Sequence, residues 1–173
     1  MKVSVASFNQ SCCQVPRVLF ICTGNIFRSL TAEYALRDVL GTRCDIGVAS
    51  AGTEDFPHVV NPYVRDYLLS RGLDVSRHRR RTLTAELLQE RGPVIAMSTE
   101  HRAILRDRFH LRDVPLFTEA CGFPTEPLPD VDEVVKDYKT NPSAVEAHVR
   151  TIIDRIIQLT PELANRLLLQ GES

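Results

Sequence analysis

The stretch VLFICTGNIFRS, residues 18–29, decides how the rest of the chain is interpreted. It begins with an unbroken apolar run, which is typical of a strand buried on both faces of a parallel sheet. Gly24 and Asn25 then interrupt the run with residue types that tolerate the left-handed backbone of a tight turn. Apolar residues next recur at helical spacing over 32–40, and Gly41 follows them. The stretch therefore predicts a strand, a short loop and a helix.

The same loop has the composition of an oxyanion site. Cys22 ends the strand and Ser29 begins the helix, so the backbone N–H groups between them can converge on one anion at a helix N-terminus. Arg28 adds a guanidinium that can bind two phosphate oxygens at once. These charges favour a thiolate, which makes Cys22 a candidate nucleophile to whose sulfur Ser29 can donate a hydrogen bond. A buried thiol at a strand end is the simpler alternative for Cys22.

Short apolar runs and helical periods alternate along the remaining chain. The spacing predicts further strands at 45–51, 93–97 and 114–117, and further helices at 61–72, at 83–91 and after Ser98 or Thr99. The strongest helical period covers 145–157 and is expected to end near Thr160-Pro161, before one more short helix. In the first helix, Glu33, Arg37 and Asp38 are expected on the side away from the core.

This alternation predicts an α/β fold, a three-layer sandwich in which a four-stranded parallel sheet has helices on both faces. Residues 1–16 show no period, so we interpret them as an N-terminal extension before a single domain at 17–173. Ligands of such sheets bind beyond the carboxyl ends of the strands. The loop after Cys22 lies at that edge, and so does the proline-rich loop with Asp130 and Asp132 after the expected fourth strand.

Composition narrows the class of protein. A chain of 173 residues with 43% hydrophobic and 25% charged residues is typical of a soluble globular domain. Its net charge of -1 gives no reason to expect nucleic acid or a membrane surface as a partner. Five cysteines without a C-x-x-C pair do not indicate a disulfide framework or a structural zinc, and no segment resembles a secretion signal or a membrane span. We therefore expect a cytoplasmic protein without a metal ion.

On these residues, the sequence resembles the low-molecular-weight protein tyrosine phosphatase family, which shares its fold with the thioredoxin-coupled arsenate reductases. The resemblance runs from Val18 to about Ile157. Besides the loop after Cys22, it includes the segments Ser50-Ala51-Gly52-Thr53, Asn61-Pro62, His78-Arg79-Arg80-Arg81 and Met97-Ser98.

The resemblance implies a role for each matching residue. Cys22 would be the nucleophile, Arg28 the phosphate-binding arginine and Asp130 the general acid. Substrate contacts are expected from Thr23, Gly24, Asn25, Ile26, Phe27 and Ser29 of the loop. The resemblance also implies a hydrogen-bond network that fixes the loop, made by Asn25, Ser29, Ser50 and His78, and an aromatic flank of the substrate ring by Phe56. No metal or organic cofactor is implied.

Four comparisons with the family refine the expected regulation, general acid and substrate. Phe27 stands where the family often has a second cysteine, so a disulfide that protects the nucleophile is not expected. Asp130-Val131-Asp132 replaces the usual Asp-Pro with a following aromatic, which removes an aromatic wall and leaves Asp132 as an alternative acid. Ile26 stands where relatives that resemble protein arginine phosphatases carry threonine, which favours aryl phosphates. Arsenate reductases need two further cysteines after His78, and residues 82–92 contain none.

The sequence therefore predicts a protein tyrosine phosphatase that hydrolyses aryl phosphate monoesters through a cysteinyl-phosphate intermediate. A non-catalytic or very slow phosphate-binding protein of the same fold is the alternative, and an arsenate reductase is less favoured. The expected partner is a phosphotyrosine-bearing protein, for example a tyrosine kinase. The protein is expected to be a monomer or weak dimer.

Overall fold

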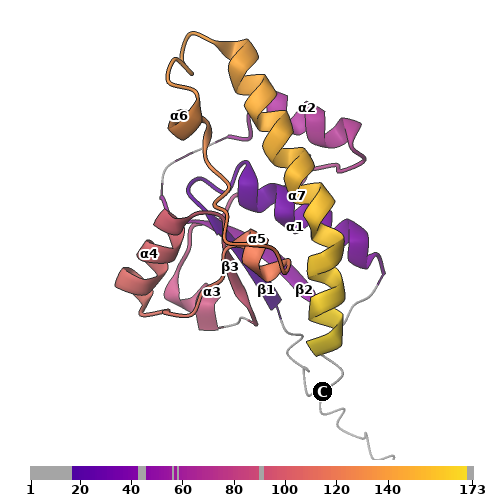
Figure 1. Cartoon of the computed structure of the whole chain (residues 1–173), viewed down its shortest axis with the longest axis vertical. Coiled ribbons are helices and arrows are strands. Elements are labelled where there is room, and N and C mark those ends of the chain that lie inside the picture. Colours follow the sequence, from indigo (N-terminus) through magenta and orange to yellow (C-terminus); the bar gives the residue numbers. More distant parts are fainter. Residues whose placement is uncertain (1–16, 43–45, 56, 58, 90–91, 171–173) are drawn as a thin grey trace, which may run out of the picture.

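The computed structural model of the chain describes residues 17–42, 46–55, 57, 59–89 and 92–170. In this part, a parallel sheet has three strands in the order β2-β1-β3 (Figure 1). The strands are β1 (Arg17–Cys22), β2 (Gly47–Gly52) and β3 (Val94–Ala96). Phe20 in the central strand is paired with Ser50 on one side and with Ile95 on the other. This central position explains why β1 has no alternating polar residues.

Helices surround the sheet. In chain order they are α1 (Arg28–Leu40), α2 (Pro62–Ser70), α3 (Ala85–Gln89), α4 (Thr99–Phe109), α5 (Phe117–Ala120), α6 (Val131–Val134) and α7 (Pro142–Gln170). As expected, α2 begins after an N-cap by Asn61, whose side chain accepts the N–H of Tyr63 at 2.9 Å.

Alternate residues of β1 enter two separate hydrophobic cores. Val18 and Phe20 belong to the larger core, together with residues of α1, α2 and α7. Leu19 and Ile21 belong to the smaller core, together with residues of α3 and α4. Figure 1 shows α1, α2 and α7 on one side of the sheet and α3 and α4 on the other. The expected α/β fold, a parallel sheet covered by helices, is confirmed.

The expected fourth strand at 114–117 is reduced to one bridge in the described structure. Leu116 forms an isolated parallel bridge with Ala96. Pro115 accepts a hydrogen bond from the N–H of Ala96 at 3.0 Å, but it has no N–H of its own to continue a ladder. The N–H of Leu116 is bonded to the carboxylate of Glu119 at 2.7 Å, and α5 begins at the next residue. The described sheet therefore has three strands where four were predicted.

The final helix is also longer than expected, because α7 continues through Pro161. Thr160 donates its hydroxyl to the carbonyl oxygen of Ile156 at 2.7 Å, which gives a partner to one of the backbone groups near the proline. Buried residues on both sides of the proline, among them Leu159 and Leu163, belong to the same core. The prediction of a helix end at this point was wrong, because packing along a continuous apolar face outweighs the hydrogen bond that proline removes.

Candidate active site

The loop between β1 and α1 lies at the carboxyl edge of the sheet. We call residues 22–29 the Cys22 loop. Asn25 has a φ of 56°, the left-handed conformation that the sequence predicted for this turn. The end of β2 packs directly against the loop, since a Cβ on Gly52 would lie 2.6 Å from the carbonyl oxygen of Thr23. The N–H of Thr53 donates to the carbonyl of Cys22 at 2.9 Å, which joins the same two segments.

Asn25 is the centre of the network that holds this loop. Its Oδ1 accepts the backbone N–H of Arg81 at 2.9 Å, so its Nδ2 is the donor to its other partners. Nδ2 donates to the hydroxyl oxygens of Ser29 at 3.0 Å and of Ser50 at 2.7 Å. The side chain is fully buried. The structure thus brings together the serines that were expected to fix the loop.

His78 holds the same asparagine through its backbone. Its Nε2 donates to the carbonyl oxygen of Asn25 at 2.9 Å, because a carbonyl can only accept. Burial lowers the pKa of His78 from its ordinary value, and the hydrogen bond to Asn25 opposes that shift with a smaller effect. A neutral imidazole with its proton on Nε2 therefore satisfies this contact.

The network orients a proton toward the sulfur of Cys22. Ser29 lies 2.9 Å from Sγ and already accepts from Asn25, so its own hydrogen is available to the sulfur. The backbone N–H of Asn25 also donates to Sγ, at 3.3 Å. Cys22 itself is 2% exposed. Two hydrogen-bond donors, one side chain and one backbone N–H, therefore contact Sγ.

Glu33 is a member of this network that the sequence pattern misplaced. It was expected to face away from the core, yet it is only 2% exposed. Ser50 donates to its carboxylate, and Arg37 and Arg81 form ion pairs with it. Helical periodicity places Glu33 on the polar side of α1, but it does not indicate that β2 and the segment with Arg81 cover that side.

Arg28, the first residue of α1, is 1% exposed and lies beside the same loop. Its Nη1 donates to the carbonyl of Leu128 at 3.0 Å, and its Nη2 donates to the hydroxyl of Thr23 at 3.1 Å and to the carboxylate of Asp130. Within the described part of the chain, its buried Nε has no hydrogen-bond partner. A buried donor without a partner is unusual, and an anion in the loop would supply the acceptor.

Asp130 lies in a second segment at the same edge, residues 128–135, which we call the Asp130 segment. Its side chain is 32% exposed, pairs with Arg28 and caps α6 by accepting the N–H of Val131 at 2.8 Å. His148 of α7 donates to the carbonyl of Pro129 at 3.1 Å and so connects α7 to this segment. Asp132 is exposed in the first turn of α6 and does not line the cavity described below.

His101 is a buried residue of the site that sequence reasoning missed. Its Nε2 lies 3.0 Å from the hydroxyl oxygen of Thr23, and its Nδ1 lies 2.8 Å from that of Ser98. Burial, with a smaller contribution from the charge of Arg28, lowers the pKa of His101 to about 3. The ring is therefore neutral near pH 7 and connects Ser98 to the Thr23–Arg28 contact. Its only sequence signal was its position three residues after Ser98.

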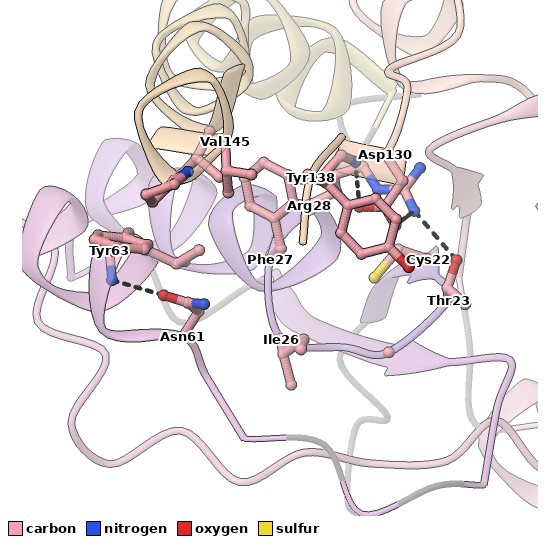
Figure 2. Close-up of a pocket in the computed structure, with 15 residues that line it drawn as sticks. Cys22, Thr23, Ile26, Phe27, Arg28, Asn61, Tyr63, Asp130, Tyr138 and Val145 are labelled. Carbon is pink, nitrogen blue, oxygen red and sulfur yellow. Dashed lines mark hydrogen bonds and ion pairs between the residues drawn. The ribbon is translucent and has the colours of Figure 1, made fainter. Parts of the chain in front are cut away.

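A cavity of about 380 Å³ opens above the Cys22 loop (Figure 2). Predicted residues line one end of it: Cys22, Thr23, Gly24, Ile26, Phe27, Arg28 and Asp130. Figure 2 shows Asn61, the N-cap of α2, with Tyr63 of α2 and Val145 of α7 on the side away from Cys22. The predicted Phe56 lies outside the described residues. Tyr138, which follows α6, lines this cavity and provides an aromatic wall that the sequence comparison had expected to be missing.

The described residues form neither a metal-binding cluster nor a membrane-spanning helix. No group of three or more His, Cys, Asp or Glu side chains among them could hold a metal ion. None of their helices is both long enough and apolar enough to cross a membrane.

Comparison with known sequences gives a consistent family. The model of the family "Low molecular weight phosphotyrosine protein phosphatase" matches residues 17–167. The low molecular weight protein-tyrosine-phosphatase Etp of Escherichia coli is 34% identical over 87 residues, which are 50% of this chain and 57% of that protein. An arsenate reductase of Staphylococcus xylosus is 34% identical over 83 residues, 48% of this chain and 60% of that protein. The chain therefore spans less than two thirds of these curated relatives.

Comparison with solved structures agrees on the fold. The YwlE arginine phosphatase from Geobacillus stearothermophilus superposes with a TM-score of 0.73 and 22% identity, over 90% of this chain and 94% of that one. At this identity, the similarity establishes the fold alone.

Proposed function

The chain belongs to the low molecular weight phosphotyrosine protein phosphatase family, and on this premise we propose that it hydrolyses phosphotyrosine and other aryl phosphate monoesters through a cysteinyl-phosphate intermediate. Cys22 is the proposed nucleophile, Arg28 the phosphate ligand and Asp130 the general acid. A phosphotyrosine-bearing protein as partner, for example a tyrosine kinase, and a cytoplasmic location belong to the same proposal.

The burial of Arg28 and the donor on its side chain that is unpaired within the described structure support this proposal most directly. Its guanidinium is buried beside Cys22, and among the described residues its Nε lacks an acceptor. A phosphoryl group in the Cys22 loop would accept from this donor and would also lie at the N-terminus of α1. A neutral ligand would leave the charge of Arg28 to the carboxylates of Asp130 and Glu133.

In the first step, the thiolate of Cys22 attacks phosphorus, and the bond between phosphorus and the leaving oxygen breaks. Ser29 donates to the sulfur, while Arg28 and the backbone N–H groups of the loop stabilise charge on the equatorial oxygens. Protonated Asp130 transfers its proton to the departing phenolate oxygen. The phenol leaves, and phosphorus remains bonded to Sγ.

In the second step, water attacks phosphorus and the phosphorus–sulfur bond breaks. The carboxylate of Asp130 takes a proton from that water, and the sulfur returns as a thiolate. Without substrate, Asp130 pairs with Arg28, so phosphate must replace Asp130 on Arg28 before the acid reaches the leaving oxygen. Asp132 is the weaker candidate because it is exposed outside the cavity.

The walls of the cavity support an aryl ester over a phosphoguanidinium group. Ile26, Phe27 and Tyr138 line it near Cys22 and offer apolar contact to an aromatic ring. Among the lining residues, Asp130 is the carboxylate that could accompany a guanidinium, and it is already paired with Arg28. Arginine phosphorylation remains the alternative substrate class to test, because an arginine phosphatase has the same fold.

The test compares wild type with Cys22→Ser on p-nitrophenyl phosphate, phosphotyrosine peptides and phosphoarginine peptides. We expect turnover of the first two by wild type, a trapped phosphoryl group on Cys22, and loss of turnover in Cys22→Ser. Faster hydrolysis of phosphoarginine than of phosphotyrosine would contradict the aryl specificity. Tight binding of phosphopeptides without any turnover would instead identify a phosphate-binding protein.

Cysteine-relayed arsenate reduction receives less support from the described residues. Besides Cys22, the free cysteine among them is Cys121, which is buried in the larger core. Burial raises the pKa of Cys121 to about 12, which disfavours the thiolate that a disulfide relay requires. We expect no thioredoxin-coupled reduction of arsenate, measured as consumption of the reducing cofactor.

A further inference from the structure

The cavity has two ends of different chemistry. Near the Cys22 loop it contains a thiol, a guanidinium and a carboxylate. Away from the loop its walls come from α2, from α7 and from the segment between α6 and α7. We call this far part, lined by Tyr63, Val64, Val145 and Val149, the valine subsite. Figure 2 shows Tyr63 and Val145 on the side of the cavity away from Cys22.

We propose that the valine subsite binds an apolar side chain that is adjacent in sequence to the phosphorylated residue of a polypeptide substrate. This inference rests on the proposed function, because it assumes that the phosphoryl group occupies the Cys22 loop. It assigns a peptide preference that catalysis at Cys22 does not itself require.

The chemistry of the valine subsite excludes a charged occupant. None of its four residues is charged, and Asn61 beside it already uses its side-chain oxygen to cap α2. A charged group placed there would lose its hydration without gaining a partner. An aliphatic or aromatic side chain would bury its surface against the valines and the ring of Tyr63.

The valine subsite is preformed. Val64 and Val149 are each 3% exposed and belong to the larger core, where α2 and α7 pack together. Tyr63 is 41% exposed at the rim, so an occupant would cover surface that is now in contact with solvent. Fixed walls reduce the entropy lost on binding, which increases the affinity obtained from a small apolar contact.

Continuity with the Cys22 loop identifies the occupant. A single cavity of about 380 Å³ joins both ends, and this volume exceeds that of one aromatic ring in the Cys22 loop. A group in the valine subsite therefore belongs to the same ligand as the phosphate. In a peptide, consecutive Cα atoms are about 3.8 Å apart, so a side chain next to phosphotyrosine stays within reach of this cavity.

The experiment measures binding to the Cys22→Ser protein, which removes turnover from the readout. Phosphotyrosine peptides carry Leu, Ala or Lys at the position directly before or directly after the phosphotyrosine. We expect the Leu peptide to bind about tenfold more tightly than the Ala peptide at one of these positions, because a leucine side chain becomes buried. The Lys peptide should bind no better than the Ala peptide.

A negative charge introduced at Tyr63 tests the location of the valine subsite. Tyr63→Glu places a carboxylate at the rim in the first turn of α2, where acidic residues are well tolerated. In the Cys22→Ser background, it should abolish the preference for Leu and make the Lys peptide the tighter ligand. Leu69→Glu is the matched control, since Leu69 is exposed on the same helix and does not line the cavity. It should keep the preference for Leu.

The outcomes separate this inference from the proposed function. Equal binding of the Leu, Ala and Lys peptides would overturn the valine subsite, even if wild type hydrolyses p-nitrophenyl phosphate. A Leu preference that survives Tyr63→Glu would also overturn it. Absence of p-nitrophenyl phosphate turnover by wild type would refute the phosphatase, whereas the peptide ranking would still support or overturn the valine subsite.

Discussion

The Cys22 loop and the Asp130 segment face the same cavity but are held in different ways. The Cys22 loop is fixed from within by Asn25, which bonds two serines and the backbone of Arg81. The Asp130 segment has a four-residue helix, and its acid is bonded to Arg28. The nucleophile is therefore positioned before substrate binds, whereas the acid is held by the group that must bind phosphate. Arg28 links the two regions.

Arg28→Lys should disrupt both the Cys22 loop and the Asp130 segment, and it should have the largest effect on activity. Lysine keeps the charge but loses the planar donors that contact Leu128, Thr23 and Asp130. We expect kcat/KM for p-nitrophenyl phosphate to fall about 10³-fold. Arg150→Lys on the exposed face of α7 is the control and should leave kcat/KM unchanged. A loss smaller than tenfold in Arg28→Lys would refute the role of its fork geometry.

Asp130→Asn tests the Asp130 segment alone. Asparagine can still cap α6, but it cannot donate a proton to a poor leaving group. We expect about a 10²-fold loss of kcat/KM with phenyl phosphate and only a few-fold loss with p-nitrophenyl phosphate, because kcat/KM reports the step in which the phenol leaves. Asp132→Asn is the matched variant and should change neither rate. The reverse ranking of the two variants would assign the acid to Asp132.

Asn25→Gly tests the hydrogen-bond network that fixes the Cys22 loop. Glycine adopts the left-handed backbone of this position easily, so the variant removes the side-chain hydrogen bonds without straining the turn. We expect about a tenfold loss of kcat/KM and a loss of about 1–2 kcal/mol in the free energy of unfolding by urea. His110→Gly is the control, because His110 has a φ of 58° at the end of α4, outside the cavity. Equal effects of the two variants would show that only backbone conformation matters.

His101 gives the smallest expected effect, which appears in the pH dependence of stability. Burial lowers its folded-state pKa to about 3, below the ordinary value of about 6.5 that applies to the unfolded chain. The unfolded chain thus binds the extra proton first, and stability falls as pH decreases from 6.5 toward 3. Between pH 6 and pH 5, wild type should lose about 1 kcal/mol more stability than His101→Gln. Identical pH dependence by urea unfolding would contradict a neutral buried ring.

The hydrogen-bond network of the Cys22 loop was predicted before the structure was known. The loop composition and the resemblance together indicated Asn25, Ser29, Ser50 and His78, and the structure brings these four together. Local signals explain the prediction of Asn25 and Ser29, because an unbroken apolar run, a glycine and a helix start lie within twelve residues. Ser50 and His78 were implied by the resemblance alone. The α/β alternation was equally local, since each strand and helix shows its own period.

What the sequence did not indicate depends on contacts between distant segments. Tyr138 reaches the cavity because the segment after α6 folds back over the Cys22 loop, and no period predicts that return. Glu33 has the pattern of a surface residue until β2 covers it. At Pro115, one missing N–H limits a strand that the apolar pattern had predicted. At Pro161, packing continues a helix that the proline was expected to end.

Because α7 continues past Pro161, a displacement at one end of the helix can be transmitted to the other end. The 29 residues of the helix span roughly 43 Å at about 1.5 Å per residue. Val145 and Val149 at one end line the cavity, while Leu163 near the other end is packed in the core. A rigid tilt of about 3° around the midpoint would move the cavity wall by about 1 Å. Displacements of that size alter catalytic alignment. Substitutions in the distant half of α7 should therefore change which peptides fit the cavity, with no residue near Cys22 altered.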